Sequence, residues 1–472
     1  MPLGVSGTWL FVMIRLGWMV DRLDPGKVKF LKTERDKRKG MDVSKRAPSR
    51  VRLFYGWYIL AASFAILFFT SGARYSFGVA FKPMIKELDW SRGSISFAFF
   101  LNMTLFALSL IAAGRLYDRY GPKWVIFVST FFLSAGFALI SVVNSLWQFY
   151  IVYGVFAAVG LGGTSIPLLA ALISRWFTKW RGLAISLALA GNCMGQFVLI
   201  PVFTFCTFRY GWRVSYLSIG LMMGIVIMTL VLFVIRESPD HLGPSPAHEK
   251  EAEKKERSGE AASGDRLQDL SLRGAMKTSP FWLFLVVMFV CGSGDFLVTT
   301  HLIPFATDHG ILPAQAGNML AWLGLMSLLG VLIAGPASDL IGNKIPMAIA
   351  FMIRFGAFLL ILTYQDVASF YLFSILFGLT YLVTGPLATT LLGRLYGFSH
   401  IGLLSGFATT VHHIGGGFWA YLGGLIFDQT GSYRLAFICS AVLALIAIVC
   451  CILIREKRHI HLSKSSTQQA LT

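Results

Sequence analysis

The sequence predicts an all-α, polytopic membrane protein with twelve transmembrane helices in two pseudo-symmetric six-helix bundles. Composition gives the first indication, because 56% of the 472 residues are hydrophobic and only 14% are charged. A soluble core cannot bury so much apolar surface, so lipid must surround most of the chain. The two further indications are the spacing of the apolar runs and an internal repeat.

The apolar residues form runs of about 20 residues, the length that crosses a bilayer as a helix. In hydrocarbon every backbone polar group must be hydrogen-bonded within its own segment, which favours helices. A membrane barrel would instead alternate apolar and polar residues along short strands. The runs are 55–81, 94–114, 123–144, 147–172, 182–207, 214–235, 281–306, 316–337, 345–363, 368–392, 402–426 and 434–454.

Two segments occur twice at nearly the same spacing. The sequence GRLYDRYGPK at 114–123 matches GPASDLIGNK at 335–344, 221 positions later, and each follows an apolar run. The sequence PLLAALISR at 167–175 likewise matches PLATTLLGR at 386–394, 219 positions later. Two similar membrane halves predict a transporter in which one half rocks against the other around a central site.

The polar segments divide the chain further. We expect six-helix bundles at 51–236 and 281–458, joined by a charged cytoplasmic linker at 237–280. A short interfacial helix is expected near 268–277, at the end of this linker.

The two ends of the chain are expected to be cytoplasmic tails. Residues 1–50 contain twelve Lys or Arg and five Asp or Glu, and Arg15 interrupts their apolar patch. That patch is too short and too charged to span a membrane, and it lacks the small-residue cleavage site of a secretory signal. Translation from Met1 and translation from Met41 both fit the sequence. The segment 459–472 is the second tail.

The net charge of +18 would suggest nucleic-acid binding in a soluble protein, but here it indicates orientation. The connections around Asn144, Asp308 and Asp366 contain no Lys or Arg, and the loop over 82–92 is the exception on that side. Because basic loops stay inside the cell, both termini are expected in the cytoplasm and the protein in the cell membrane. The basic side contains Arg115, Arg119, Lys123, Arg175, Lys179, Arg181, Lys344, Arg394, Arg455, Lys457 and Arg458.

The sequence offers no pattern for a metal, a cofactor or an enzyme. Its six cysteines lie inside apolar runs, without CxxC or His/Cys metal spacing, and are interpreted as small core residues. HExxH, a phosphate-binding P-loop and a serine-hydrolase motif in a plausible context are all missing. ATP-driven pumping, which would need a nucleotide-binding domain, is therefore not expected, nor is an obligate protein partner.

The loop motif Gly-x-x-x-Asp-Arg-x-Gly-x-Lys and the division into six helices, a linker and six helices resemble the major facilitator superfamily over 51–458. The stretch WFTKWRGLAISLALAGNCMG at 176–195 is similar to the helix 4–5 signature of the monocarboxylate transporter family. Residues 55–57 have no acidic residue ahead of the glycine. In this they are more similar to bacterial members related to oxalate–formate exchangers.

The resemblance implies a secondary active transporter in a bacterial inner membrane. It would move a small organic anion, favouring a monocarboxylate together with a proton, by alternating access. An oxalate/formate-type anion exchanger and a non-transporting membrane sensor on the same fold are the alternatives. The family often holds the substrate carboxylate with an arginine and an aspartate of helix 8, yet residues 317–334 contain no charge. The anion site must then be built from other residues, or the substrate differs.

Ionisable residues inside apolar runs are costly in a membrane, so they are candidate site residues. Arg74 lies late in the first run, within SGARYSFG at 71–78. Its guanidinium is a planar fork that can bind a carboxylate with two hydrogen bonds. By resemblance, the family also places a basic residue close to this position. We expect Arg74 to bind the substrate; the alternative is a side chain that extends to the outer interface.

Asp295 follows Gly292 and Gly294 near the middle of the seventh run and is the candidate for proton coupling. A low-dielectric environment favours the neutral form of a carboxyl group, which suits a proton carrier. A fixed partner for a basic residue is the alternative. Aligning the halves on Trp57 with Trp282 and on Gly93 with Gly317 places Arg74 opposite residues 298–299. We therefore hypothesise that ionised Asp295 neutralises Arg74, and that a proton on Asp295 frees Arg74 for the substrate.

Histidines in two helices are further substrate-binding candidates, because imidazole titrates near neutral pH. His301 begins HLIPFATD, a pattern similar to bacterial members, although a buried histidine bonded to a backbone carbonyl also fits. Adjacent His412 and His413 point about 100° apart on a helix, and the resemblance favours His412 as the one facing the cavity. Arg354 lies in the ninth run, which is usually peripheral in the superfamily, so structural pairing is expected there.

Polar residues of lower priority complete the candidate set. Asn192, Gln196 and Tyr381 are candidate hydrogen-bonding residues of the cavity lining. Asp118, Arg119 and Asp339 of the repeated loops are expected to act in gating, by capping helix ends or pairing with a basic residue. Simple anchoring of the topology is the alternative for these loops.

Overall fold

The computed structural model describes residues 54–177, 180–236, 270–397 and 400–454. The predicted tails, 1–50 and 459–472, and most of the predicted linker 237–280 lie outside this part. Residues from Tyr55 onward form one unit, to which the following description applies.

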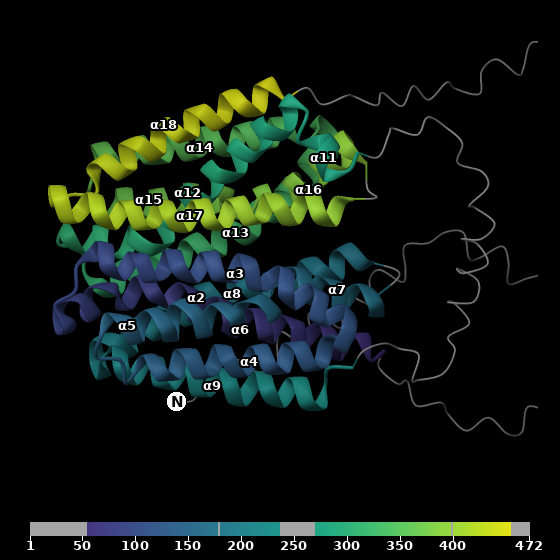
Figure 1. Ribbon diagram of the computed structural model, residues 1–472. Helices are drawn as coiled ribbons and strands as arrows, with labels where there is room; N and C mark the ends of the chain where they lie inside the picture. The colour runs from purple at the N-terminus through teal and green to yellow at the C-terminus, as the bar shows by residue number, and fades with distance from the viewer. Residues whose placement is uncertain (1–53, 178–179, 237–269, 398–399, 455–472) are drawn as a thin grey trace, which may run out of the picture. The chain divides into compact units, whose positions relative to one another are not determined.

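The first half contains six membrane crossings (Figure 1). The fourth crossing consists of four consecutive helical segments. The elements are α2 (Gly56–Leu88), α3 (Arg92–Tyr120), α4 (Pro122–Ile140), α5 (Leu146–Phe149), the π-helix η3 (Tyr150–Ala157), α6 (Ala158–Gly163), α7 (Ile166–Trp176), α8 (Arg181–Tyr210) and α9 (Trp212–Phe233).

The second half repeats this arrangement after a four-residue helix, and its fourth crossing consists of two segments. The elements are α11 (Leu272–Ala275), α12 (Ser279–Asp308), α13 (Pro313–Ile341), α14 (Lys344–Thr363), α15 (Val367–Tyr381), α16 (Thr384–Tyr396), α17 (Ile401–Thr430) and α18 (Arg434–Leu453).

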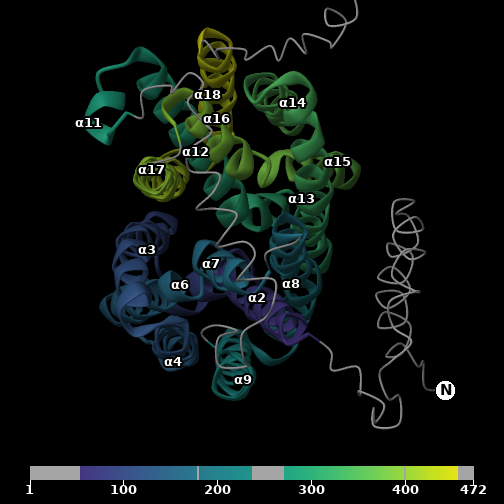
Figure 2. The same cartoon turned by 90° about the vertical axis from the view of Figure 1, so that its right-hand side faces the viewer.

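The predicted all-α class is confirmed: the described residues form helices and turns, without strands. Eleven crossings are long and apolar enough to span a membrane. The remaining crossing, α17, has 30 residues and includes two adjacent histidines and a run of glycines, which make it less apolar. Viewed along the helices, α4 and α9 lie at the outer edge of one bundle and α14 and α18 at that of the other (Figure 2). The bundles meet where α3 packs on α17 and α8 packs on α13.

The repeated loop motifs adopt the same backbone conformation in both halves. Gly121 joins α3 to α4 with φ 79°, and Gly342 follows α13 with φ 83°. A residue with a side chain is strained at positive φ, whereas glycine is not, so a glycine at this position of each motif allows the sharp turn between crossings. The sequence repeat therefore corresponds to a structural repeat.

The fourth and tenth crossings are both interrupted near their middle. α6 ends at Gly163 and α7 begins at Ile166, while α15 ends at Tyr381 and α16 begins at Thr384. Pro167 and Pro386, the first residues of the second sequence repeat, lie just after the two interruptions. Because proline has no backbone N–H, the preceding turn loses a hydrogen bond at this point.

Asp366 begins the tenth crossing as the N-cap of α15. Its carboxylate accepts a hydrogen bond from the backbone N–H of Ser369 at 2.7 Å, and this bond lowers the pKa of Asp366 below its usual value. A lowered pKa stabilises the fold above the unfolded pKa, and the contribution is lost as pH falls through the folded pKa. We expect Asp366→Ala to lower the thermal midpoint at neutral pH and to have less effect in acid. Asp366→Asn, which also caps, should stay close to wild type at both pH values. Equal effects of Asp366→Ala at both pH values would contradict this role.

Candidate functional site

Ion pairs join the two halves at one end of the molecule, where α2 and α12 end and α3 begins. We call this end the sealed end and define it by Lys82, Arg92, Asp308, Asp428 and Tyr433. Arg92 donates to both carboxylate oxygens of Asp308 at 2.6 and 2.9 Å, and Lys82 lies 2.6 Å from the same carboxylate. Arg92 also donates to the hydroxyl of Tyr433 at 3.0 Å. One aspartate of the second half thus holds two cations of the first.

Asp428 adds a second connection at the sealed end. Its carboxylate accepts from the backbone N–H groups of Arg92 at 3.0 Å and Gly93 at 2.7 Å, so the second half caps the start of α3. Nearby, a methyl group added to Gly424 would lie 2.6 Å from Ser96 Oγ, because the two helices touch here. A methyl group on Gly335, Gly385 or Gly406, in contrast, would meet no heavy atom within 4 Å. Gly335 and Gly406 lie toward the opposite ends of α13 and α17, and Gly385 lies at the start of α16, near the middle of the tenth crossing.

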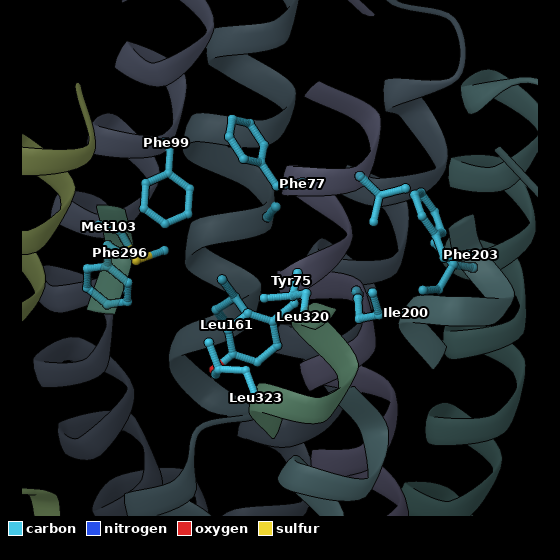
Figure 3. Close-up of a cluster of buried hydrophobic side chains, with 14 of the residues drawn as sticks. Tyr75, Phe77, Phe99, Met103, Leu161, Ile200, Phe203, Phe296, Leu320 and Leu323 are labelled. Atoms are coloured by element: carbon cyan, nitrogen blue, oxygen red, sulfur yellow. The ribbon is translucent and has the colours of Figure 1, made fainter. Parts of the chain in front are cut away.

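Arg74 lies in α2 among aromatic side chains at the contact between the halves. Its guanidinium carbon lies 5.3 Å from the ring centres of both Phe106 and Phe296, and Nη2 lies 3.3 Å from Met103 Sδ. Figure 3 shows Phe99, Met103 and Phe296 side by side. Within the described part of the chain, Arg74 has no carboxylate partner. Its charge is held only by weak acceptors.

Asp295, in α12, is 3% exposed and belongs to a separate charged cluster. Arg354 Nη2 lies 2.9 Å from Asp295 Oδ1, in an ion pair whose alignment is not that of a linear hydrogen bond. His412 Nε2 lies 3.9 Å from Oδ2, and the thiol of Cys291 donates to Oδ2 at 3.3 Å. We expected Arg74 to pair with Asp295, but the ion-pair partners in the described residues are Arg354 and His412. The side chain of Arg354 reaches in from α14, a helix expected to be peripheral.

The cluster of Cys291, Asp295 and His412 has ligand atoms within 4.8 Å of one another, a separation that a metal ion could bridge. The guanidinium of Arg354, however, already holds Asp295, and it lies 3.6 Å from Cys291 Sγ. A cation at this position would repel a bound metal ion. The geometry is therefore that of a hydrogen-bonded ion-pair cluster.

The two histidines of α17 connect the charged cluster with the aromatic surroundings of Arg74. The ring of His412 lies 5.4 Å from Phe296, the same ring that faces Arg74, and its Nδ1 has no hydrogen-bond partner in the described structure. His413 stacks edge-on against Phe106 at 4.8 Å and hydrogen-bonds the carbonyl of Thr409. Phe296 thus separates Arg74 from His412.

His301 lies at the sealed end, with both ring nitrogens hydrogen-bonded. Nδ1 is 3.0 Å from the hydroxyl of Tyr433, and Nε2 is 2.8 Å from the carbonyl oxygen of Ala420. The residue is completely buried. This is the carbonyl-bonded arrangement that the sequence left open as the alternative to substrate binding.

The other candidates lie in different surroundings. The hydroxyl of Tyr381 is 2.9 Å from that of Tyr75, a hydrogen bond between the two halves. Asn192 is half-buried, and its backbone carbonyl accepts from Ser71 at 2.6 Å. Gln196 is buried and donates to the carbonyl of Leu320 at 2.9 Å.

The gating candidates lie at the end opposite the sealed one. Asp118 and Arg119 are exposed in the last turn of α3, where Arg119 lies over the ring of Tyr120 at 5.2 Å. Asp339 belongs to α13, but its side chain lies outside the described structure. A gating role for these three residues stays a prediction.

Aromatic residues around Arg74 are the part of the site that the sequence did not indicate. Phe106, Phe296 and Met103 are ordinary members of apolar runs, and the chain contains 40 phenylalanines. Which of them faces the centre depends on the rotation of each helix about its own axis, and the sequence does not give this rotation. The buried Arg354 was visible in the sequence, and its pairing was expected, but its partner was not.

Two bundles of membrane helices in contact around a central cationic and polar region are typical of a membrane transporter. The family model of the Major Facilitator Superfamily matches residues 63–312 and 285–471, so this chain belongs to that superfamily. The predicted family resemblance is confirmed.

Curated relatives agree with this assignment. The chain is 25% identical to the uncharacterized MFS-type transporter YcxA of Bacillus subtilis, over 83% of this chain and 94% of the relative. It is 26% identical to monocarboxylate transporter 13 of Bos taurus, over 81% and 85%. It is 25% identical to the oxalate:formate antiporter of Oxalobacter formigenes, over 83% and 89%.

Solved structures show the same fold at low identity. A bacterial homolog of the human lysosomal transporter Spinster, in an inward-facing and unoccupied conformation, aligns with a TM-score of 0.66 at 16% identity, covering 85% of this chain and 97% of that one. A D-xylose-proton symporter aligns with a TM-score of 0.62 at 15% identity, with the same coverage.

Proposed function

We propose that this protein is a secondary active transporter that moves a small monocarboxylate across the membrane by alternating access, together with a proton. Arg74 carries the proposal, because it is a half-buried guanidinium between the two halves whose contacts with the described residues are a thioether and aromatic rings. A positive charge in such surroundings is costly unless an anion compensates it. A substrate carboxylate would supply that anion.

Charge balance favours a monocarboxylate over a dianion. In the described central region, Arg354 is compensated by Asp295, which leaves Arg74 as the uncompensated cation. With Asp295 ionised, one carboxylate would neutralise the site, whereas a dianion such as oxalate would leave one negative charge without a partner. The aromatic rings around Arg74 suit the apolar remainder of a monocarboxylic acid. Exchange of oxalate for formate is the second candidate, supported by the relative that carries this name.

The distribution of the basic loops predicts which side of the membrane the sealed end faces. If the basic loops lie in the cytoplasm, the sealed end faces outward and the structure represents a state closed to the outside. Opening toward the outside would then break the contacts of Asp308 with Lys82 and Arg92. Proton coupling is assigned to Asp295 and its neighbour His412, which lie one aromatic ring away from Arg74.

The test is uptake into proteoliposomes containing the full chain, with labelled lactate, pyruvate, formate and oxalate. We expect lactate or pyruvate to accumulate under an imposed pH gradient, and oxalate to be transported at least tenfold more slowly. Vesicles preloaded with unlabelled substrate, without a pH gradient, measure exchange in the same assay. Rapid oxalate uptake that depends on internal formate would favour the exchanger. Absence of transport of every acid tested would refute the proposed function.

A further inference from the structure

Arg354 is the largest completely enclosed side chain of the described structure, and it is 1% exposed. A buried charge in a membrane helix is expensive, so its position calls for a physical reason. The repeat offset of 221 places Leu133 at the corresponding position of the first half, and Leu133 is an ordinary buried apolar residue. The charge of Arg354 therefore has no counterpart at the matching position of the first half.

The guanidinium of Arg354 binds the end of α15, at the interruption of the tenth crossing. Nη2 donates to the carbonyl oxygens of Thr380 at 2.9 Å and Tyr381 at 3.4 Å, and Nε donates to Thr380 Oγ1 at 3.0 Å. The last carbonyls of a helix have no helical N–H partner and carry partial negative charge. Arg354 thus supplies, from a neighbouring helix, the donors that the interrupted crossing lacks.

The same guanidinium also holds α12. Nη1 donates to the carbonyl oxygen of Cys291 at 3.3 Å, and Nη2 forms the ion pair with Asp295. A single side chain therefore joins the seventh, ninth and tenth crossings. The interruption in the fourth crossing is stabilised differently. There the hydroxyl of Thr164 donates a neutral hydrogen bond to the carbonyl oxygen of Gly160 at 3.1 Å.

Tyr381 is the last residue of α15 and connects this junction with the other half. Its carbonyl oxygen accepts from Arg354, and its hydroxyl is hydrogen-bonded to Tyr75 of α2, the neighbour of Arg74. A shift at the end of α15 would therefore change the contact between the halves next to the proposed substrate cation. The titratable and charged groups facing the junction are Cys291 of α12, Tyr381 of α15, His412 and His413 of α17, and Arg74 and Tyr75 of α2.

We propose that Arg354 is a positioning residue whose ion pair with Asp295 holds the interruption of the tenth crossing closed against Tyr75, so that a proton added to Asp295 releases this interruption. The inference rests on the proposed function, since it assigns the structural consequence of the coupling proton. With Asp295 ionised, the charge of Arg354 is balanced and its N–H groups cap α15. Once a proton binds a carboxylate oxygen of Asp295, the guanidinium becomes a buried cation without a counter-charge, and this cost destabilises the enclosed position in which it binds Thr380 and Tyr381.

Four variants of the full chain test the inference: Arg354→Lys, Arg354→Gln, Asp295→Asn and the double variant Asp295→Asn with Arg354→Gln. Lysine keeps the charge but not the planar fork, so we expect Arg354→Lys to lower kcat about tenfold with little change in KM. Asp295→Asn should remove the pH dependence of transport. Arg354→Gln leaves a buried carboxylate unpaired and should express poorly, and the double variant should restore expression while its transport stays slow and independent of pH.

A second measurement does not depend on transport. Hydrogen exchange of backbone amides around 378–386 should become about tenfold faster in Asp295→Asn. The uncompensated charge of Arg354 should destabilise the end of α15 by about the free energy of one hydrogen bond. Amides around 160–167, at the interruption of the fourth crossing, should be unchanged and serve as the internal control.

The outcomes separate this inference from the proposed function. If wild type transports monocarboxylates but Arg354→Lys and the double variant keep wild-type kcat, KM and pH profile, the inference fails and the proposed function stands. If wild type transports none of the acids, the proposed function fails. In that case faster exchange confined to 378–386 still supports the role of Arg354, and unchanged exchange overturns it.

Discussion

Replacing Arg74 by glutamine is expected to lower kcat/KM for monocarboxylate uptake about 100-fold. The expectation follows because a bidentate charge-assisted bond contributes roughly 3 kcal/mol, and each 1.36 kcal/mol corresponds to a factor of ten. Folding should be little affected, since among the described residues the guanidinium contacts Met103 Sδ and the rings of Phe106 and Phe296, without a carboxylate partner. The measurement is initial uptake of labelled lactate or pyruvate into proteoliposomes, normalised to the amount of inserted protein.

Two further variants make this result specific. Arg74→Lys keeps the charge but offers one donor direction instead of a fork, so its activity should lie between wild type and Arg74→Gln. Arg209→Gln removes a cation from the exposed last turn of α8 and should transport like wild type. Wild-type uptake by Arg74→Gln would remove the anion-binding role from this residue. Equal losses in Arg74→Gln and Arg209→Gln would indicate a general effect of charge.

The fold could be predicted because the membrane restricts the possible structures. Runs of about 20 apolar residues can cross only as helices, and the repeated motifs at 114–123 and 335–344 show that the six-helix unit occurs twice. The lengths of the helices were predicted less accurately, because α2 continues to Leu88 and α12 to Asp308, beyond the apolar runs. Polar residues at these ends are tolerated because they face water or pair across the halves, so composition alone places the ends too early.

The sequence predicted which residues belong to the candidate site, but not how their side chains are arranged. Arg74, Asp295, His412 and Arg354 are unusual because each is an ionisable residue in an apolar run, and such residues are rare without a function or a partner. Aligning the two halves gives the depth of a residue in the membrane but not the direction in which its side chain points. For this reason Arg74 and Asp295 were expected to face each other, although Asp295 turns toward Arg354.

The exception to the positive-inside pattern has a structural explanation. The loop over 82–92 carries basic residues on the side that otherwise lacks them, and in the structure Lys82 and Arg92 both bind Asp308. Arg92 also lies over the ring of Phe427 at 3.5 Å. These charges form contacts between the halves, and they do not follow the rule that basic loops lie on the cytoplasmic side. An unexpected charge in a loop pattern can thus indicate a contact between the two halves.

Replacing Asp308 by asparagine is accordingly expected to open the sealed end. The change removes the charge that holds Lys82 and Arg92, each of which lies 2.6 Å from the carboxylate, and it leaves two cations facing each other. Ser96, which is completely buried beneath this end next to Gly424, reports on the opening. In a chain carrying Ser96→Cys, a membrane-impermeant maleimide should label the new cysteine about tenfold faster when Asp308→Asn is also present. Labelling of the chain without Ser96→Cys gives the background of the native cysteines.

Asp366→Asn is the matched control, because Asp366 lies on the same side of the membrane but caps α15 within its own half. It should leave labelling at position 96 unchanged. High salt should narrow the difference between wild type and Asp308→Asn, since Asp308 and Lys82 are partly exposed and their attraction is screened. A labelling rate in Asp308→Asn equal to that of wild type would show that the cap formed by Asp428 on α3 and the packing around Gly424 suffice to close this end. The ion pairs would then orient the two halves without keeping the sealed end closed, and the helix contacts would supply the energetic barrier to opening.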